Sequence, residues 1–552
     1  MANQITDNRT NRAVAKTTAP ENETWEASGG GGSVVEDTDI FIEGTTSVAE
    51  QISTSRRVML YDNGSTIDIS DSHVYIWVNC GIVGLLDIKS NGGMTVRLTG
   101  PTSTNFVEWY VGGSDSWPSS IQGGWTMFVV DTASTPSNTG GTPPLLTAIQ
   151  KIGISAVTAS VMTKAADNTW VDAIWTLSDG NPGIIVEGRN GGTTDWTFAD
   201  INTQLTNSAG VFVQSAGGAW KCNAPIQFGI NDTTTHGFTD TNTTVLWDDQ
   251  EFAASDHYGM SALGNSGGTT RVVLGNKTGT GDAATGAQGG SIQAAATGVR
   301  YYMDFDDANI DDIGFYGVTF QHAGDFQLDS AATSAISCLF IDCSSANVTD
   351  CRDFLKNKII DANTADGVAF ATTNDLADMV FNEFQFSDGH AVELTTTPAK
   401  VTAQTDKGNT YSGYGATGSN DAEYYNNTGS GLVTISVTDG GDGADYRNGT
   451  SASTTVQNTV TLTVNVSDSD GNAVQGARVR IEDDPLGTLV SDGTTNASGV
   501  FSDATYNFAG NEDVIVKVRL KGYVFFRTGG TITSDGITVP VTLVTDTVVE
   551  LP

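Results

Sequence analysis

The stretch from Ile313 to Val348 reads IGFYGVTFQHAGDFQLDSAATSAISCLFIDCSSANV, and it begins a pattern of three short apolar strands that recurs as far as Leu394. Successive members of each strand series begin 18 to 25 residues apart. The first series is Ile313–Phe315, Ala335–Ser337, Asp353–Leu355 and Ala377–Met379; the second is Val318–Phe320, Leu339–Ile341, Lys358–Ile360 and Glu383–Gln385; the third is Phe326–Leu328, Ala346–Val348, Val368–Phe370 and Val392–Leu394. Three series that advance together predict a parallel β-helix, because a single coil cannot bury its apolar face without a neighbour.

The repeat lies within residues 181–428, for which we predict this parallel β-helix. This part of the chain resembles the β-helical shafts of phage tailspikes and tail fibres. The resemblance implies a structural protein of a bacteriophage virion, and such shafts are commonly homotrimers.

The rest of the chain also favours strands. Val74, Ile76 and Val78 alternate with other residue types, and we find no sustained 3.6-residue period. Turn dipeptides such as Asn63-Gly64 and Asp492-Gly493 punctuate the whole length. A chain of 552 residues exceeds what one core can organise. We therefore predict an all-β protein with several domains.

Residues 35–180 contain, in order, the segments FIEG (41–44), GGWTMFVVD (123–131), IQKIGI (149–154) and WVDAI (170–174). These segments resemble the concanavalin-like jelly rolls of carbohydrate-binding modules and viral surface proteins. The resemblance implies a structural calcium ion held by the matching positions, Glu43 and Asp172, although a turn glutamate and a surface aspartate are equally compatible. Trp125 and Trp170 are candidates for a glycan-binding platform, with packing in the core as the alternative.

Residues 456–552 carry the segment VNVSDSDGNAVQGARVRI at 464–481, in which two alternating strands flank an Asp-Gly-Asn turn. This segment resembles bacterial Ig-like and carboxypeptidase-regulatory-like β-sandwiches, and the length suits one sandwich. The resemblance implies weak binding to cell-surface glycans, since such domains are appended to many phage coat and tail proteins.

Residues 429–455 are rich in Gly and Asp and separate the predicted β-helix from the sandwich. The segment GGDGAD at 440–445 fits half of a calcium-binding RTX repeat. It occurs once, and Arg447 stands where the motif requires an apolar residue. We therefore predict a solvated linker here.

The charge balance excludes several partners. The chain has 64 acidic and 26 basic residues and a formal net charge of -38. It lacks the basic footprint that nucleic acids and anionic membranes require, and no apolar run approaches the ~18 residues of a membrane span. The five cysteines form neither a disulfide framework nor a zinc motif, so we expect buried free thiols.

Familiar catalytic motifs such as GxSxG, HExxH, the P-loop and CxxC are missing from the sequence. The five histidines each have a polar or glycine neighbour, and we expect them at the surface or in turns. Carboxylates are the remaining candidates for catalysis, because β-helical tailspikes can cleave glycans with an acidic pair.

One candidate set lies in the segment YYMDFD at 301–306. Strand alternation places Tyr302, Asp304 and Asp306 together on the outer face, which would put a glycan-binding aromatic ring beside two carboxylates.

A second candidate set comes from the repeat alignment, in which Gln321, Asp342 and Asp361 share one ladder position. Coils about 4.8 Å apart would bring Asp342 and Asp361 near the ~5–5.5 Å separation of a retaining glycosidase pair. Turn aspartates that cap backbone N–H groups explain the same pattern, so no residue is firmly assigned to catalysis.

Residues 1–34 contain no apolar run of the roughly 7–15 residues that a secretory signal needs, and we expect an arm that docks to other virion proteins. The favoured interpretation is a non-enzymatic tail fibre or spike, exposed on the virion, that binds host glycans. The alternatives are a capsid decoration or head-fibre protein, a glycan-cleaving tailspike and a secreted bacterial adhesin.

Overall fold

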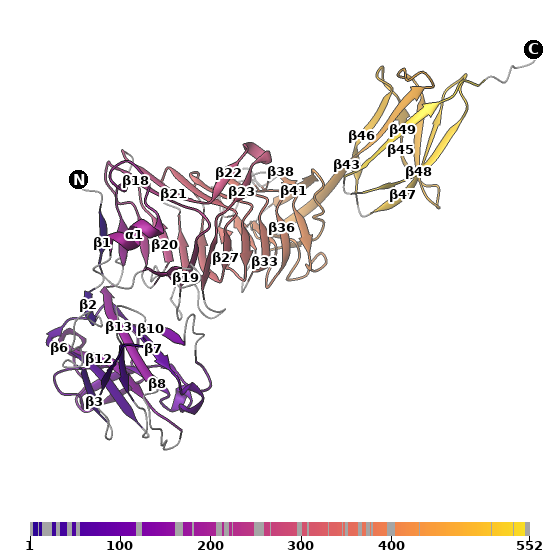
Figure 1. Cartoon of the computed structure of the whole chain (residues 1–552). Helices are drawn as coiled ribbons and strands as arrows, with labels where there is room; N and C mark the ends of the chain where they lie inside the picture. The colour runs from indigo at the N-terminus through magenta and orange to yellow at the C-terminus, as the bar shows by residue number, and fades with distance from the viewer. Residues whose placement is uncertain are drawn as a thin grey trace, which may run out of the picture. The chain divides into compact units, whose positions relative to one another are not determined.

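The structure is a computed structural model of the whole chain. It describes residues 4–8, 10–13, 25–28, 34–40, 47–50, 56–117, 124–159, 169–178, 182–205, 212–214, 220–222, 225–247, 259–264, 267–294, 301–305, 309–328, 330–344, 346–347, 351–362, 367–370, 376, 379–394, 403–429, 431–508, 511–533 and 535–546. The protein is all-β, as the sequence predicts, and α1 (Phe198–Gln204) is the one α-helix among these residues (Figure 1). None of the helices described is long and apolar enough to cross a membrane.

The chain divides into two compact units. The first comprises Met1–Gly279 and Thr285–Ala346, and the second comprises Thr280–Ala284 and Asn347–Pro552. Each unit contains a β-sandwich and a set of parallel ladders.

The sandwich of the first unit has two antiparallel sheets. One sheet has the order β10-β7-β13-β5-β4, with β2 also paired to β13, and its strands are β2 (Thr10–Ala13), β4 (Val35–Asp37), β5 (Ser47–Glu50), β7 (Ser72–Cys80), β10 (Trp125–Asp131) and β13 (Thr169–Ser178). The other has the order β11-β9-β8-β12-β6-β3, with strands β3 (Trp25–Ser28), β6 (Arg57–Ile67), β8 (Met94–Thr99), β9 (Phe106–Gly112), β11 (Asn138–Gly140) and β12 (Ile149–Ala156).

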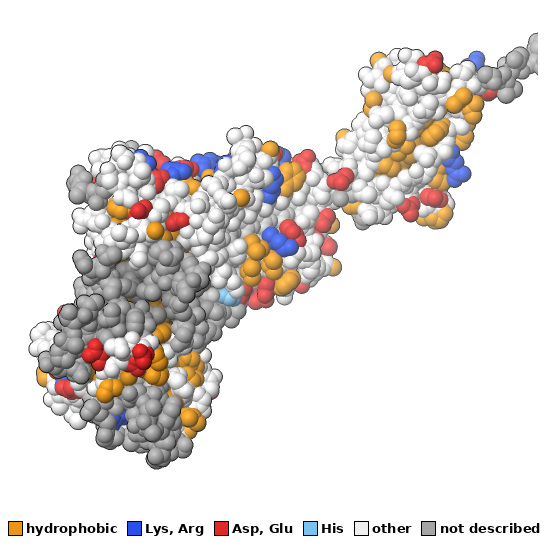
Figure 2. Space-filling view, viewed as in Figure 1, with side chains coloured by type: hydrophobic (Ala, Val, Ile, Leu, Met, Phe, Trp, Pro, Cys, Tyr) orange, Lys and Arg blue, Asp and Glu red, His pale blue; other side chains and the backbone are white. Residues whose placement is uncertain are grey.

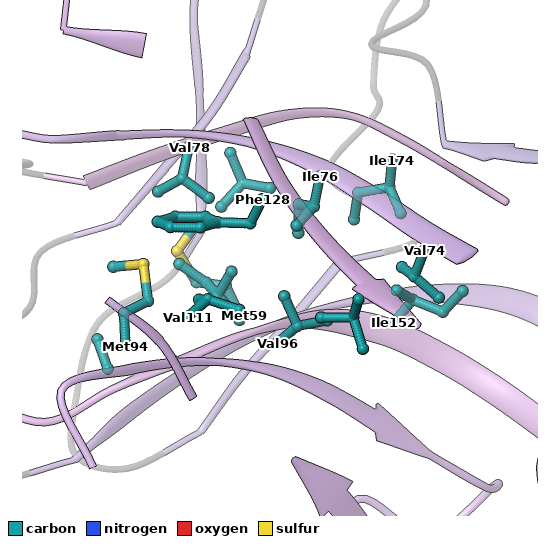
Figure 3. Close-up of a cluster of buried hydrophobic side chains, with 14 of the residues drawn as sticks. Met59, Val74, Ile76, Val78, Met94, Val96, Val111, Phe128, Ile152 and Ile174 are labelled. Carbon is teal, nitrogen blue, oxygen red and sulfur yellow. The ribbon is translucent and has the colours of Figure 1, made fainter. Parts of the chain in front are cut away.

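The alternation along β7 explains how the two sheets pack. Val74, Ile76 and Val78 point into the core, where they meet side chains of the facing sheet such as Val96 (Figure 3). The intervening aromatic residues of β7 are also buried, and the Tyr75 ring stacks on Trp175 with a centroid distance of 3.7 Å. This sheet is therefore covered on both faces.

Parallel ladders follow the sandwich in the first unit (Figure 1). In chain order, the first ladder contains β18 (Thr235–Asp240), β21 (Thr269–Leu274), β26 (Asp312–Tyr316) and β29 (Thr333–Ile336); the second contains β16 (Trp220–Cys222), β19 (Thr244–Trp247), β24 (Ser291–Ala294), β27 (Thr319–Gln321) and β30 (Leu339–Ile341); the third contains β14 (Ile184–Val186), β17 (Ile226–Phe228), β20 (Gly259–Ala262), β25 (Tyr301–Asp304) and β28 (Ala323–Gln327). Three further pieces are antiparallel: β1 (Ile5–Asp7) pairs with β14, β15 (Phe212–Gln214) with β16, and β22 (Asn276–Thr278) with β23 (Thr285–Ala287).

The second unit also contains three sets of parallel strands. The first has β32 (Asp353–Leu355), β35 (Met379–Val380), β38 (Ala403–Lys407), β41 (Gly431–Thr438) and β43 (Ala452–Asp468); the second has β33 (Lys358–Ala362), β36 (Glu383–Ser387) and β39 (Thr410–Ser412); the third has β34 (Val368–Phe370), β37 (Val392–Leu394), β40 (Tyr424–Asn426) and β42 (Tyr446–Asn448). The three strand series predicted from the sequence therefore coincide with three sets of parallel strands, and β31 (Ala346–Asn347) is the remaining predicted member.

A column of asparagines supports these turns in the second unit. Asn357, Asn382 and Asn409 each precede a strand of the second ladder and are buried. The backbone N–H of Asn357 donates to Oδ1 of Asn382 at 2.8 Å, and that of Asn382 donates to Oδ1 of Asn409 at 2.8 Å. The amides thus satisfy backbone groups that the turns would otherwise leave buried and unpaired.

The C-terminal sandwich is continuous with the ladders through one long strand. The sheet β46-β43-β49 contains β46 (Val500–Asn507) and β49 (Ile537–Leu543), and the sheet β45-β44-β47-β48 contains β44 (Arg478–Asp483), β45 (Leu489–Thr494), β47 (Glu512–Arg519) and β48 (Phe526–Ile532). The first half of β43 pairs with β41, and its second half pairs with β46 and β49.

Much of the predicted linker at 429–455 therefore forms strands instead. The alternation of Val433, Ile435 and Val437 buries these side chains, so β41 extends the first ladder by another coil. These strands form because the apolar period-2 run favours a strand more than the surrounding Gly and Asp residues favour a loop.

Candidate functional site at the last coils

The structure removes two aromatic residues from the proposed glycan platform. Trp125 is 3% exposed and Tyr302 is 9% exposed, so neither presents an open ring face. Trp170 is partly exposed, but its indole Nε1 donates to Oδ2 of Asp37 at 2.8 Å, and this bond holds the ring in place. Tyr301 and Met303, the neighbours of Tyr302, are buried, which agrees with the inner face that alternation predicts for them.

In the second carboxylate set, Gln321 and Asp342 do not share one ladder position. Gln321 pairs with Ile341, one residue away from the alignment that placed it opposite Asp342. The register follows from the inner face, where the rings of Phe320 and Phe340 stack 5.1 Å apart. Asp342 instead faces His322, whose Nδ1 lies 2.9 Å from its Oδ2.

The remaining acidic candidates are described only in part. Asp361 is exposed and belongs to the second unit, whereas Asp342 belongs to the first. Asp304 is partly buried in the third ladder, and Asp306 lies outside the described residues.

The predicted calcium-binding pair is also described only in part. Glu43 also falls outside the described residues, while Asp172 is 2% exposed on β13. No group of three or more potential metal-ligating side chains occurs in the described part of the chain.

The histidines and cysteines whose side chains the structure describes are buried. His73 and His236 are buried within strands, so the expectation of surface or turn histidines is wrong for these two. His322 and His390 lie between strands, as the expectation of turn positions allows, but they are buried, and His257 is not described. Cys80, Cys338, Cys343 and Cys351 are buried free thiols, as predicted, and burial raises the pKa of Cys338 to about 12.

The final coils of the second unit contain a polar cluster that the sequence did not reveal. Asp406 is fully buried and accepts hydrogen bonds from the Tyr411 hydroxyl at 2.6 Å, from the Tyr424 hydroxyl and from the Asn409 amide at 2.6 Å. Burial raises the pKa of Asp406 and, more strongly, those of the two tyrosines. The cluster fixes both aromatic rings beneath the Gly/Asp-rich segment.

Three carboxylates hold that segment against the coils. Oε2 of Glu423 accepts the backbone N–H groups of Ala444 and Asp445, at 2.6 and 2.9 Å. Asp442 accepts the N–H of Tyr411 at 2.9 Å, and Asp445 accepts the N–H of Thr417 at 2.8 Å. GGDGAD is therefore a folded segment that hydrogen bonds tie to the ladder.

Two of these carboxyls titrate abnormally. Burial raises the pKa of Glu423 to about 7, against the opposing effect of its two backbone hydrogen bonds. Burial also raises the pKa of Asp442. The segment is thus held by a group that changes its charge near neutral pH.

A cavity opens beside this segment where β43 passes from the last coil into the sandwich. We call it the joint cavity; its volume is about 440 Å³, and it is lined by Asp442, Gly443, Ala444, Val456, Asn458, Asn507 and Phe508. Asn458 organises it, because its N–H donates to Oδ1 of Asn507 at 3.1 Å and its carbonyl accepts from the N–H of Phe508 at 2.6 Å. Gly443 is required here, since a Cβ would lie 1.9 Å from the Tyr424 hydroxyl.

The lining combines one aromatic ring, two amides and one carboxylate. These are the groups that recognise a small polyhydroxylated ligand, and the volume falls within the ~300–1,000 Å³ of ligand sites. A second cavity of about 420 Å³ on the same joint is lined by carboxylates and threonines without an aromatic ring. Sequence reasoning missed both cavities, because they depend on where the sandwich meets the last coil.

Comparison with known proteins leaves the family open. No family model and no curated protein matches the chain. An exo-β-agarase structure is similar at 12% identity over 30% of this chain and 24% of that chain, with a TM-score of 0.21. A carbohydrate-binding module of the β-sandwich superfamily is similar at 17% identity over 28% of this chain and 56% of that chain, with a TM-score of 0.19. The chain thus matches only part of each structure and is assigned to no family.

Proposed function

We propose that this protein is a structural protein exposed on a phage virion, and that it adheres to host surface glycans without cleaving them. The observation that carries the adhesion proposal is the joint cavity, with Phe508 on its wall beside Asn458, Asn507 and Asp442. A sugar ring offers an apolar face to an aromatic side chain and hydroxyl groups to amides and carboxylates.

The surface suits such a ligand. Uncharged side chains and backbone cover most of the described surface seen in Figure 2, with acidic side chains scattered among them. A single shallow contact of this kind binds weakly, but several copies held together bind tightly through their effective concentration. Assembly as a homotrimer and docking through residues 1–34 to other virion proteins belong to the same proposal.

Glycan binding is tested with the purified full chain on an array of bacterial surface oligosaccharides. Phe508→Ala removes the aromatic wall, and we expect affinity to fall roughly tenfold. Phe525→Ala is the matched control, because Phe525 is 56% exposed on the same sandwich and does not line the cavity. Equal losses in both variants, or no binding by the wild type, would contradict the adhesion proposal.

The position on the particle is tested by imaging virions labelled with an antibody to residues 456–552. We expect label at the tail tip, which is where a fibre or spike engages the host. Label over the head would make the protein a capsid decoration or head fibre. Particles without label would leave the secreted bacterial adhesin as the better explanation.

Cleavage is tested separately with host polysaccharide. We expect the wild-type protein to leave its viscosity unchanged, since Asp342 is buried and engaged with His322. Loss of viscosity that Asp304→Asn or Asp342→Asn abolishes would establish the glycan-cleaving alternative.

A further inference from the structure

The third ladder of the second unit has an outward column on its last three strands. Glu393 of β37 pairs with Tyr425 of β40, and Tyr425 pairs with Arg447 of β42. Each is the middle residue of a three-residue strand. The residues on either side in β37 and β40 are buried, so alternation directs this column away from the core.

An aromatic ring forms the centre of the column. The Tyr425 ring contacts the His390 ring at a centroid distance of 4.6 Å and an interplanar angle of 30°. The guanidinium carbon of Arg447 lies 4.9 Å from the Tyr425 ring centre. These contacts fix the positions of a ring, an imidazole and a guanidinium side by side.

His390 is held in one tautomer. Its Nδ1 lies 2.8 Å from the carbonyl oxygen of Ala422, which can only accept, so the proton is on Nδ1. Burial lowers the pKa of His390, and the Arg447 charge acts in the same direction. Nε2 is therefore an acceptor, and it lies 3.5 Å from Nη1 of Arg447.

Arg447 has unusual surroundings for an arginine in a chain of net charge -38. Among the described residues, its guanidinium makes contacts with His390 and Tyr425 but no ion pair. A planar guanidinium offers five N–H donors, so most of its capacity remains for a ligand. Glu393 lies at the other end of the column from Arg447, and its Oε1 accepts a hydrogen bond from the Asn427 amide at 2.9 Å.

We propose that the column Glu393–Tyr425–Arg447, with His390 and Asn427 beside it, is a second glycan-binding surface and that its ligand is a neutral saccharide. It presents an aromatic ring, hydrogen-bond donors and acceptors, and one charge of each sign. Neighbouring strands lie about 4.8 Å apart, close to the length of one sugar ring, so successive rings meet successive coils. This inference rests on the proposed adhesive function and places a second contact on the same unit.

A neutral ligand follows from the electrostatics. The excess of carboxylates repels an anionic polymer at long range, and Glu393 offsets the attraction of Arg447 at short range. Hydroxyl groups avoid both costs, because they donate to Glu393 and accept from Arg447. Binding should therefore depend little on salt.

The test measures binding of the full chain to a panel of neutral oligosaccharides and to polygalacturonate, at low and high salt. We expect a neutral oligosaccharide to bind, with affinity falling about tenfold in Arg447→Gln and in Tyr425→Ala. Arg352→Gln is the matched control, since Arg352 is an exposed arginine of the same unit and lies next to Asp353 at 3.7 Å. The melting temperature of each variant is measured alongside, and Glu393→Gln provides a conservative second change if Arg447→Gln is unstable.

The outcomes separate the two proposals. Wild-type affinity in Arg447→Gln, Tyr425→Ala and Glu393→Gln, with a loss in Phe508→Ala, would overturn the second surface and leave the joint cavity standing. Tight binding to polygalacturonate that salt abolishes would overturn the assignment of a neutral ligand. A wild-type protein that binds no saccharide would overturn both proposals.

Discussion

Glu423 shows, at the scale of one residue, a property that the sequence alone does not reveal: its pKa is raised to about 7. The sequence contains 64 carboxylates, and nothing in the local segment DAEYYN distinguishes this one. Its pKa changes because the Gly/Asp-rich segment folds back over it and excludes water. The same holds for Asp406, whose three hydrogen-bond partners come together only when the coils stack. Buried acids of this kind require the three-dimensional structure.

The stability of the second unit should therefore depend on the charge of Glu423. Its folded pKa of about 7 lies above the usual 4.5, so the folded state holds the proton more tightly than the unfolded chain does. This contribution is present below about pH 4.5 and is lost as pH rises through about 7. Glu423→Gln keeps an oxygen for the two N–H donors and should reduce that loss by on the order of 2 kcal/mol.

Thermal unfolding at pH 5 and pH 8 measures this effect. Asp470→Asn is the control, because Asp470 is an exposed turn carboxylate of the same unit. If wild type and Glu423→Gln lose the same stability between these two pH values, Glu423 is not buried as described.

At the scale of elements, periodicity carried the prediction of strands but not of their alignment. The series at Lys358–Ile360 and Val368–Phe370 pair with the predicted partners, because their inner apolar residues are unambiguous. The alignment at Gln321 is wrong by one residue. The next coil offers two adjacent apolar residues as partners for the inner ring of Phe320, and the sequence does not show which of them pairs with it. Alternation did not find β41 or the beginning of β43, because both fall within 429–455, for which the sequence predicts a linker.

The asparagine column should be a sensitive point of the ladders. The amide of Asn382 donates to the carbonyl oxygen of Phe354 at 3.0 Å and accepts from the N–H of Asn357. Asn382→Ala leaves both backbone groups buried without these partners, which costs about 1–3 kcal/mol for each group. We expect a clear fall in the unfolding midpoint by denaturant titration.

The control for this change is Asn448→Ala, because Asn448 is exposed on the third ladder of the same unit. Similar midpoints for Asn382→Ala and Asn448→Ala would indicate that the column contributes nothing beyond an ordinary turn.

At the scale of the whole molecule, its two units both combine ladders with a sandwich, and the proposed ligand contacts lie where elements of the second unit meet. Such places cannot be predicted from a single sequence, because each is built from residues far apart in the chain. The joint cavity, for example, takes Asp442 from one side and Phe508 from the other. All-β class and the presence of repeats were predictable, since they depend on patterns that run along the chain.

The first half of β43 should protect the last coil from association. Residues Ala452–Asn458 are mostly polar and cover β41, whose alternating Val433, Ile435 and Val437 make a more adhesive edge. A chain that ends at Asn458 should remain soluble, and one that ends at Gly449 should aggregate. Size-exclusion chromatography with light scattering distinguishes the two, and equal solubility of both would contradict this role for β43.

The continuity of β43 also has a mechanical meaning. Seven of its residues lie in register with β41, and seven others lie in register with β49. A force that pulls on the C-terminal sandwich acts along this strand, so the hydrogen bonds on both sides are loaded in shear and resist together instead of opening one after another. Tension applied at the far end of the sandwich is thus delivered directly into the last coil.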